Sequence, residues 1–303
     1  MRRFRALVRS AALEALAEPL SAVLFLVALL TVPLLPVFHC HQFGEAGRLP
    51  RECGFSGLLV FGVIFATASA VRVVGGEISS GTAAVALSRD VPRPLFFCAK
   101  VVGVLLAFAL FAVAICASTL ASVATEEMGE VMASMGTGSH VWLPGLGATV
   151  GGTLIGFCAA AFANRFFRAR FCVCACLCVS VAQLVALAVV ALRAQTPVAW
   201  SLTAGMAVLA AGCCALVALA GALAVRLPPP AVVAILSLAV ILSFIWPVRA
   251  ILPDIQRFWL VDAYAGGGMP SVGRLAAGLG AGCLLTLFWL AVGSVLLERR
   301  EIP

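Results

Sequence analysis

Charged residues are scarce in this chain of 303 residues. Asp, Glu, Lys and Arg together make up 11% of it, whereas 63% is apolar, and the mean hydropathy is +1.14. A water-soluble fold has too little interior to bury so much apolar surface. The composition therefore excludes a soluble enzyme, a disordered chain and a small secreted domain held by disulfides.

The sequence also lacks the motifs of several enzyme classes. It contains no GxxxxGK[ST] phosphate-binding loop, no HExxH and no GxSxG, so we expect that the chain is not an enzyme and binds no cofactor itself. Asp and Glu are missing from the centres of its apolar segments, where secondary transporters usually carry ionisable groups. Transport by this chain would therefore need an outside source of energy.

Long uncharged apolar runs fill most of the sequence, and they do not alternate with period two as β-barrel strands do. About 20 apolar residues span a bilayer as a helix. The runs predict an all-α, polytopic transmembrane helical bundle that forms one domain over residues 1–303. The eight predicted spans are 19–38, 54–74, 100–124, 145–163, 171–192, 198–225, 230–251 and 273–297.

A six-span alternative stays open at one place. Only the residues RAQTP separate the fifth and sixth predicted spans, so one broken or re-entrant segment there would also fit the pattern.

The basic residues predict the orientation of the bundle. With a cytoplasmic N-terminus, 14 of the 20 basic residues fall in cytoplasmic segments and six in external ones, as the positive-inside rule requires. We therefore expect a multi-pass protein of the cell (inner) membrane with both termini in the cytoplasm. The net charge of +7 is explained by this topology, without nucleic acid as a partner.

Residues 1–18 predict a cytoplasmic interfacial helix. Apolar residues such as Phe4, Leu7 and Val8 recur at helical spacing beside a group of arginines. No small-x-small cleavage site comes after the first apolar run, so we expect this segment to be retained and not removed as a signal peptide.

Three glycine pairs have the small-xxx-small spacing that lets membrane helices approach closely. They are Gly147/Gly151, Gly152/Gly156 and Gly278/Gly282. We expect all three to serve packing within the bundle.

Residues 72–100 are too polar to cross a bilayer and more patterned than a simple turn. Ile78 and Thr82 share a face with Val85 in a predicted short helix, which Pro92 and Pro94 would end. Such a helix can act as a lever. The alternative is a solvated loop whose charges only set the topology.

The pattern of this segment resembles a known signature. The stretch EISSGT (77–82), a small apolar run, LSRDVPR (87–93) and Lys100 together resemble the cytoplasmic signature of type 2 ABC exporter permeases. Two further stretches, ILPDIQRFWLVDAY (251–264) and LLERREIP (296–303), are similar to segments of the permeases grouped with multicopper-enzyme and nitrous oxide reductase maturation systems.

The resemblance implies a permease subunit that forms a homodimer or heterodimer and docks separate ABC ATPase subunits, which hold ATP and Mg. It implies a cytoplasmic coupling loop over 75–99 and an N-terminal helix that receives the ATPase motion. The residues that it assigns to coupling are Glu77, Gly81, Thr82, Arg89, Arg93 and Lys100.

One external segment has residues suited to a bond or a metal. Cys40 and Cys53 fall on the predicted external side, where a disulfide forms in an oxidising compartment. His39, Cys40 and His41 also offer imidazole and thiolate ligands for copper or zinc. Unpaired cysteines with solvated histidines are the third possibility.

The sequence thus predicts the membrane subunit of an ATP-driven ABC exporter, which couples ATP hydrolysis on another chain to translocation of a substrate. The alternative is a membrane scaffold that does not transport and that assembles a metalloenzyme maturation complex. The polar segment at 72–100 favours the first, because a scaffold needs no lever that faces an ATPase.

Overall fold

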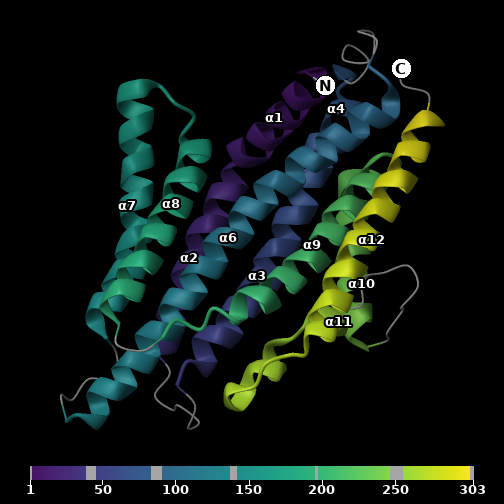
Figure 1. Ribbon diagram of the computed structural model, residues 1–303. Coiled ribbons are helices and arrows are strands. Elements are labelled where there is room, and N and C mark those ends of the chain that lie inside the picture. The colour runs from purple at the N-terminus through teal and green to yellow at the C-terminus, as the bar shows by residue number, and fades with distance from the viewer. Residues whose placement is uncertain are drawn as a thin grey trace.

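The computed structural model describes residues 2–38, 46–82, 91–136, 142–194, 197–245 and 255–300. These residues form helices and no strands, which confirms the predicted all-α bundle. Within the same ranges, seven helices are long and apolar enough to cross a membrane. Figure 1 shows them side by side in an elongated bundle.

The helices come along the chain in this order: α1 (Arg2–Ala17), α2 (Pro19–Phe38), α3 (Arg48–Ala70), the π-helical η1 (Val71–Gly76), α4 (Glu77–Ser79), α6 (Arg93–Ser134), α7 (Leu143–Phe167), α8 (Phe171–Arg193), α9 (Leu202–Ala224), α10 (Pro229–Ile245), α11 (Ile255–Phe258), the 3₁₀ turn η2 (Val261–Gly267) and α12 (Val272–Glu298). Helix α3, η1 and α4 form one continuous helical segment.

Two helices extend beyond the spans that hydropathy predicts. The second predicted span, 54–74, lies inside the continuous helical segment from Arg48 to Ser79. Helix α6 has 42 residues and is therefore about 60 Å long at ~1.5 Å per residue. This is twice the ~30 Å thickness of a hydrocarbon core, so α6 is much longer than a membrane span requires.

The region of the fifth and sixth predicted spans contains two full-length helices. Helices α8 and α9 have 23 residues each, so the structure does not have the single broken segment of the six-span alternative. The predicted span at 230–251 corresponds to α10, an apolar helix of 17 described residues. The rest of that predicted span lies outside the described residues.

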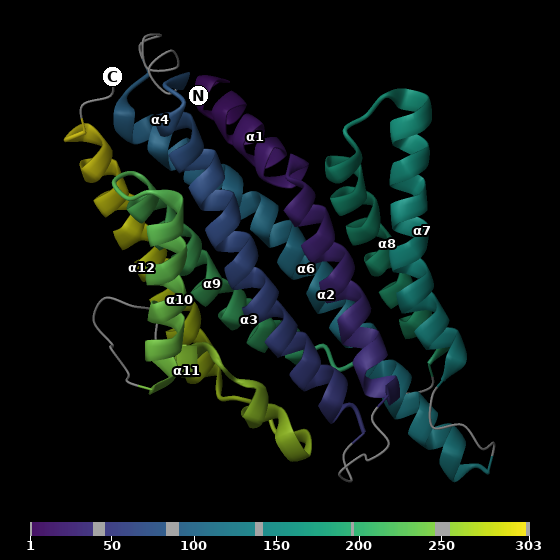
Figure 2. The same ribbon diagram turned by 180° about the vertical axis from the view of Figure 1, so that it is seen from behind.

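Helix α1 begins and helix α12 ends at the same end of the bundle, which we call the terminal end (Figures 1 and 2). Helix α4 and the connection between α7 and α8 lie at this end too. A common end for both termini agrees with the predicted topology. That this end faces the cytoplasm stays a prediction.

Helices α3, α6 and α9 form the centre of the bundle, where α3 packs on both α6 and α9. Aromatic rings fill this centre: the ring of Phe65 stacks on that of Phe111 with centroids 5.6 Å apart, and Phe25 meets Phe111 edge to face at 5.0 Å. The hairpin of α7 and α8 covers one flank, and α12 packs on α9 at the other.

The three glycine pairs differ in how closely other residues pack against them. A β-carbon added at Gly156 would lie 2.7 Å from the α-carbon of Val179, and one at Gly282 would lie 2.9 Å from the carbonyl carbon of Ala211. Gly152/Gly156 and Gly278/Gly282 therefore serve close helix packing as predicted. The prediction is wrong for Gly147 and Gly151, because a β-carbon at either would meet no described atom within 4 Å.

Candidate functional site

Helix α1 lies directly against α6 near the terminal end. A β-carbon at Gly103 would lie 2.5 Å from the Cβ of Ala11 and 2.7 Å from the carbonyl oxygen of Val8. Only glycine permits so close an approach of two helix backbones. Val8, Ala11, Ala15 and Leu16 are buried in this contact region, so the apolar face that the sequence predicts for residues 1–18 packs on protein.

Lys100 is the only lysine in the chain, and it is buried two turns into α6. Only 3% of its side chain is exposed. Its Nζ lies 2.5 Å from Oε1 of Glu77 and 3.4 Å from Oε2 of Glu14, and 5.9 Å from the ring centroid of Phe96. We call Glu14, Glu77 and Lys100 the lysine triad. It joins three elements that are distant in sequence: α1, α4 and α6.

The triad holds two carboxylates on one ammonium group. Removing an ammonium ion from water is costly, and the two opposite charges offset that cost. Burial raises the pKa of Glu14, the nearby Glu77 charge raises it further, and Lys100 acts in the opposite direction. The two carboxylates therefore balance the positive charge of Lys100, whereas Glu14 also lies near a second negative charge, that of Glu77.

A second ion pair lies close to the triad. The Nε of Arg72 in η1 lies 2.5 Å from Oε2 of Glu18, which comes directly after α1. This oxygen accepts no hydrogen bond of good geometry among the described residues, so the contact is an ion pair by proximity. The Arg72 side chain is 59% exposed, and exposed pairs of this kind contribute little stability.

The residues after Glu77 end the helix. Gly81 has a φ of +73°, a left-handed conformation that glycine adopts without strain. The Thr82 hydroxyl donates to the carbonyl of Glu77 at 3.2 Å and shares a hydrogen bond of 2.9 Å with Ser80. Gly81 and Thr82 thus stop the helical segment directly beyond the triad.

Arg93 joins the first residue of α6 to the end of α12. Its guanidinium donates to the carbonyl of Glu298 at 2.9 Å and to that of Arg300 at 3.0 Å. The last carbonyls of a helix lack partners in the helix, and a cation there also suits the helix dipole. Arg93 therefore caps α12.

The structure brings Glu77, Gly81, Thr82 and Lys100 together, while Arg93 lies apart at α12. Arg89 lies outside the described residues. So do His39, Cys40 and His41, whereas Cys53 is half-buried on α3. The predicted disulfide between Cys40 and Cys53 and the predicted metal site stay untested.

Sequence reasoning missed Glu14, Glu18 and Arg72 as members of this site. Glu14 and Glu18 are four residues apart in a segment otherwise rich in arginine. Like charges four residues apart on a helix repel each other, and a cation on a neighbouring element relieves this repulsion, so this signal was available in the sequence.

The fold and this site define an all-α membrane-spanning bundle whose terminal end is joined across α1, α4, α6 and α12 by charged side chains. Comparisons with models of protein families, with curated proteins and with solved structures found no match to this chain.

Proposed function

We propose that this chain is the permease subunit of an ATP-driven ABC exporter, which moves its substrate with energy from a separate ATPase subunit. The class of protein is proposed from the resemblance of residues 77–100 to the cytoplasmic signature of type 2 ABC exporter permeases. The lysine triad is the observation that carries the proposal, because it links the two ends of the polar segment to each other and to α1.

The geometry suits transmission of movement. Glu77 lies near the start of the polar segment at 72–100 and Lys100 is its last residue, so their ion pair joins the two ends of this segment. Glu14 adds α1 to the same cation, and Arg93 adds the end of α12. A partner that displaces residues 80–92 would therefore act on four elements at once.

The π-helical turn η1 lies directly before the triad. Short π-helical turns inside α-helices are frequent at functional sites, because they interrupt the regular hydrogen-bond ladder. Here the interruption separates the membrane-spanning α3 from the short α4. In the proposed function, η1 is where α4 moves relative to α3.

The proposed docking of an ATPase subunit is best tested at an exposed residue that takes no part in the ion pairs within the chain. Ser79 is exposed at the end of α4, and its hydroxyl donates to the carbonyl of Gly76 within the same helical segment. Ser134 is a matched control, since it is exposed at the opposite end of α6 and donates to the carbonyl of Val131.

We expect the chain purified alone to hydrolyse no ATP, and the chain purified from its native membranes to carry an ATPase subunit. Ser79→Trp should reduce the recovered ATPase subunit, or the ATP turnover that depends on the permease, by roughly tenfold, as a blocked interface does. Ser134→Trp should change neither. If both variants recovered the ATPase as the parent does, the coupling assignment would be wrong and the scaffold alternative would gain.

A further inference from the structure

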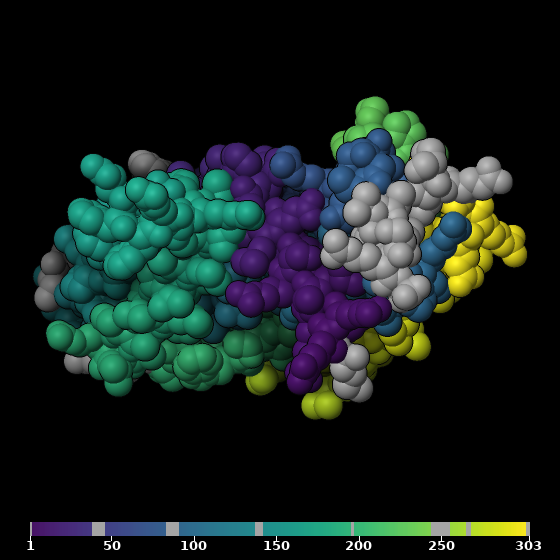
Figure 3. Space-filling model, turned by 90° about the horizontal axis from the view of Figure 1, so that it is seen from above, coloured from purple at the N-terminus to yellow at the C-terminus, as the bar shows by residue number. Residues whose placement is uncertain are grey.

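The hairpin of α7 and α8 differs from the rest of the bundle in how much apolar surface it exposes. It contacts α1, α2 and α6, while large residues such as Leu154, Ile155 and Val181 are exposed. Figure 3 shows the hairpin at one flank when the molecule is seen from the terminal end, with α1 beside it. In a bilayer, this surface faces lipid tails or another membrane protein.

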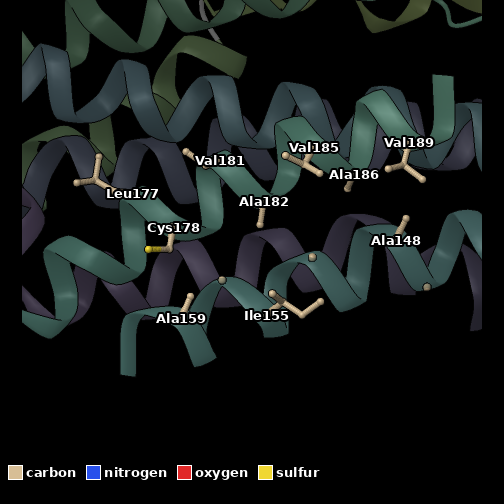
Figure 4. A pocket seen from close by; sticks show the side chains of 13 residues that line it. Ala148, Ile155, Ala159, Leu177, Cys178, Val181, Ala182, Val185, Ala186 and Val189 are labelled. Atoms are coloured by element: carbon tan, nitrogen blue, oxygen red, sulfur yellow. The ribbon is translucent and has the colours of Figure 1, made fainter. Parts of the chain in front are cut away.

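A groove runs along this hairpin between its two helices (Figure 4). Its volume is about 680 Å³, and its lining is almost wholly apolar. The groove extends from Gly147 to Ala159 on α7 and from Leu177 to Val189 on α8. The glycines of α7 that line the groove, Gly147, Gly152 and Gly156, place no side chain in it.

The groove has the length of a lipid tail. Gly147 and Ala159 are twelve residues apart, which is about 18 Å at ~1.5 Å per residue. One leaflet supplies half of the ~30 Å hydrocarbon core, or about 15 Å. An acyl chain of one leaflet therefore fits the groove lengthwise.

A basic tip lies beyond one end of the groove, where α7 turns into α8 at the terminal end of the bundle. Arg165, Arg168 and Arg170 are all exposed there. Arg168 has a φ of 53°, and the Asn164 amide donates to the carbonyl of Ala169 at 2.7 Å, so this turn is well defined. We call these three arginines the arginine tip.

The arginine tip has no acidic counterpart in its own region. The sequence contains no Asp or Glu between Glu130 and Asp254. Among the described residues, the salt bridges found do not involve the three arginines. Their positive charges are therefore available to interact with a ligand or with solvent.

The groove and the arginine tip lie close enough together for one ligand to occupy both. Arg165 is six residues beyond Ala159 on the same helix, which is about 9 Å. A molecule that fills the groove with an apolar chain thus reaches the arginines with its polar end. Basic residues where membrane helices meet the cytoplasmic surface attract anionic lipid headgroups.

We propose that the α7–α8 hairpin binds an anionic phospholipid, with one acyl chain in the groove and the headgroup phosphate on the arginine tip. The net negative charge distinguishes this ligand from a zwitterionic lipid, whose own cation would leave the arginines uncompensated. This site needs no ATPase subunit, so its test is independent of the proposed transport function.

The first experiment measures lipid binding to the full chain in detergent by native mass spectrometry. The probes are phosphatidylglycerol and phosphatidylcholine with identical acyl chains. The parent should prefer phosphatidylglycerol. The triple variant Arg165→Gln, Arg168→Asn, Arg170→Gln should lose this preference by roughly tenfold or more, since each basic residue near the headgroup adds to its attraction. Arg193→Gln removes a charge at the opposite end of α8 and should keep the preference.

The second experiment tests the groove with a matched pair of glycines on α7. Gly147 lines the groove and Gly151 does not, and a β-carbon at either meets open space. Gly147→Leu should weaken binding of both lipids about equally, because it fills the groove. Gly151→Leu should leave both affinities unchanged. The thermal unfolding of each variant shows whether the bundle is intact.

Three outcomes would overturn the proposal. In the first, the parent binds both lipids equally. In the second, Gly147→Leu and Gly151→Leu behave alike, so the groove is not used. In the third, millimolar glycerol phosphate displaces phosphatidylglycerol completely, so the arginines hold a phosphate without its acyl chain.

Discussion

Two groups of charged residues lie at the terminal end of this bundle, and they differ in burial and in their salt-bridge partners. The lysine triad and the neighbouring Arg72–Glu18 pair have their partners within the chain, and Lys100 is buried. The arginine tip is exposed, and no salt bridge found in the described part of the chain reaches it.

The difference shows what burial does to a charge. A buried cation must be compensated by the same chain as it folds, because water no longer solvates it. An exposed cation stays solvated, and its free energy falls when a partner of opposite charge arrives. The first group therefore holds helices together, whereas the second is open to recognition of a ligand.

The largest effect is expected where α1 meets α6. Gly103→Leu would place a side chain against the backbone of Val8 and Ala12, and overpacking against atoms that cannot move costs about 3 kcal/mol. We expect α1 to separate from α6 and Lys100 to become accessible. Because Lys100 is the only lysine, an amine-reactive reagent and peptide mass spectrometry measure this directly. Gly147→Leu is the control, and an unreactive Lys100 in both proteins would contradict the packing.

The next effect comes from removal of the buried cation. Lys100→Met leaves Glu14 and Glu77 facing each other without a cation. Their side chains are 35% and 24% exposed, so water screens part of the repulsion and the expected loss is about 2 kcal/mol of unfolding free energy. Adding Glu14→Gln and Glu77→Gln should restore most of it. A triple variant no more stable than Lys100→Met would show that the charges are unimportant.

A smaller effect is expected from pH at Glu14, whose pKa is raised above its ordinary value of 4.5 by burial. A raised pKa means that the folded protein binds more protons than the unfolded chain between these two values. The contribution of Glu14 to stability therefore falls as pH rises through this range, and the penalty is complete above the raised pKa. Glu14→Gln should remove this part of the pH dependence. Unfolding temperatures measured from pH 4 to pH 8 in both proteins test it, and identical slopes would refute it.

The smallest effect on stability is expected at the arginine tip. The variant Arg165→Gln, Arg168→Asn, Arg170→Gln removes exposed side chains, so the free energy of unfolding without lipid should change by less than about 0.5 kcal/mol. Its effect should be confined to lipid binding. A loss as large as that of Lys100→Met would mean that the tip serves folding, and the contrast between the two groups would disappear.

Hydropathy predicted the fold class and most spans because it records how long each apolar run is. It does not record where a helix ends once its charged ends pack on protein, which is why α6, with 42 residues, extends past both ends of the predicted span 100–124. The sequence singled out Glu77 and Lys100, yet not their pairing, because tertiary packing brings the two residues together. The same limit explains the glycines: Gly147 and Gly151 have the same spacing as Gly278 and Gly282, but among the described residues nothing lies within 4 Å of a β-carbon at either.

The π-helical turn η1 has a consequence for insertions and deletions. An α-helix turns by about 100° per residue, and a π-helical turn accommodates an extra residue without passing that rotation on to the helix beyond it. Loss of one residue from Val71–Gly76 would therefore restore a regular α-helix from Arg48 to Ser79 and would leave Glu77 facing Lys100, whereas loss of one residue from a regular α-helix rotates the residues beyond it by about 100°. A one-residue deletion within Val71–Gly76 should therefore disturb the Glu77–Lys100 ion pair less than the same deletion within a regular α-helical turn of the chain.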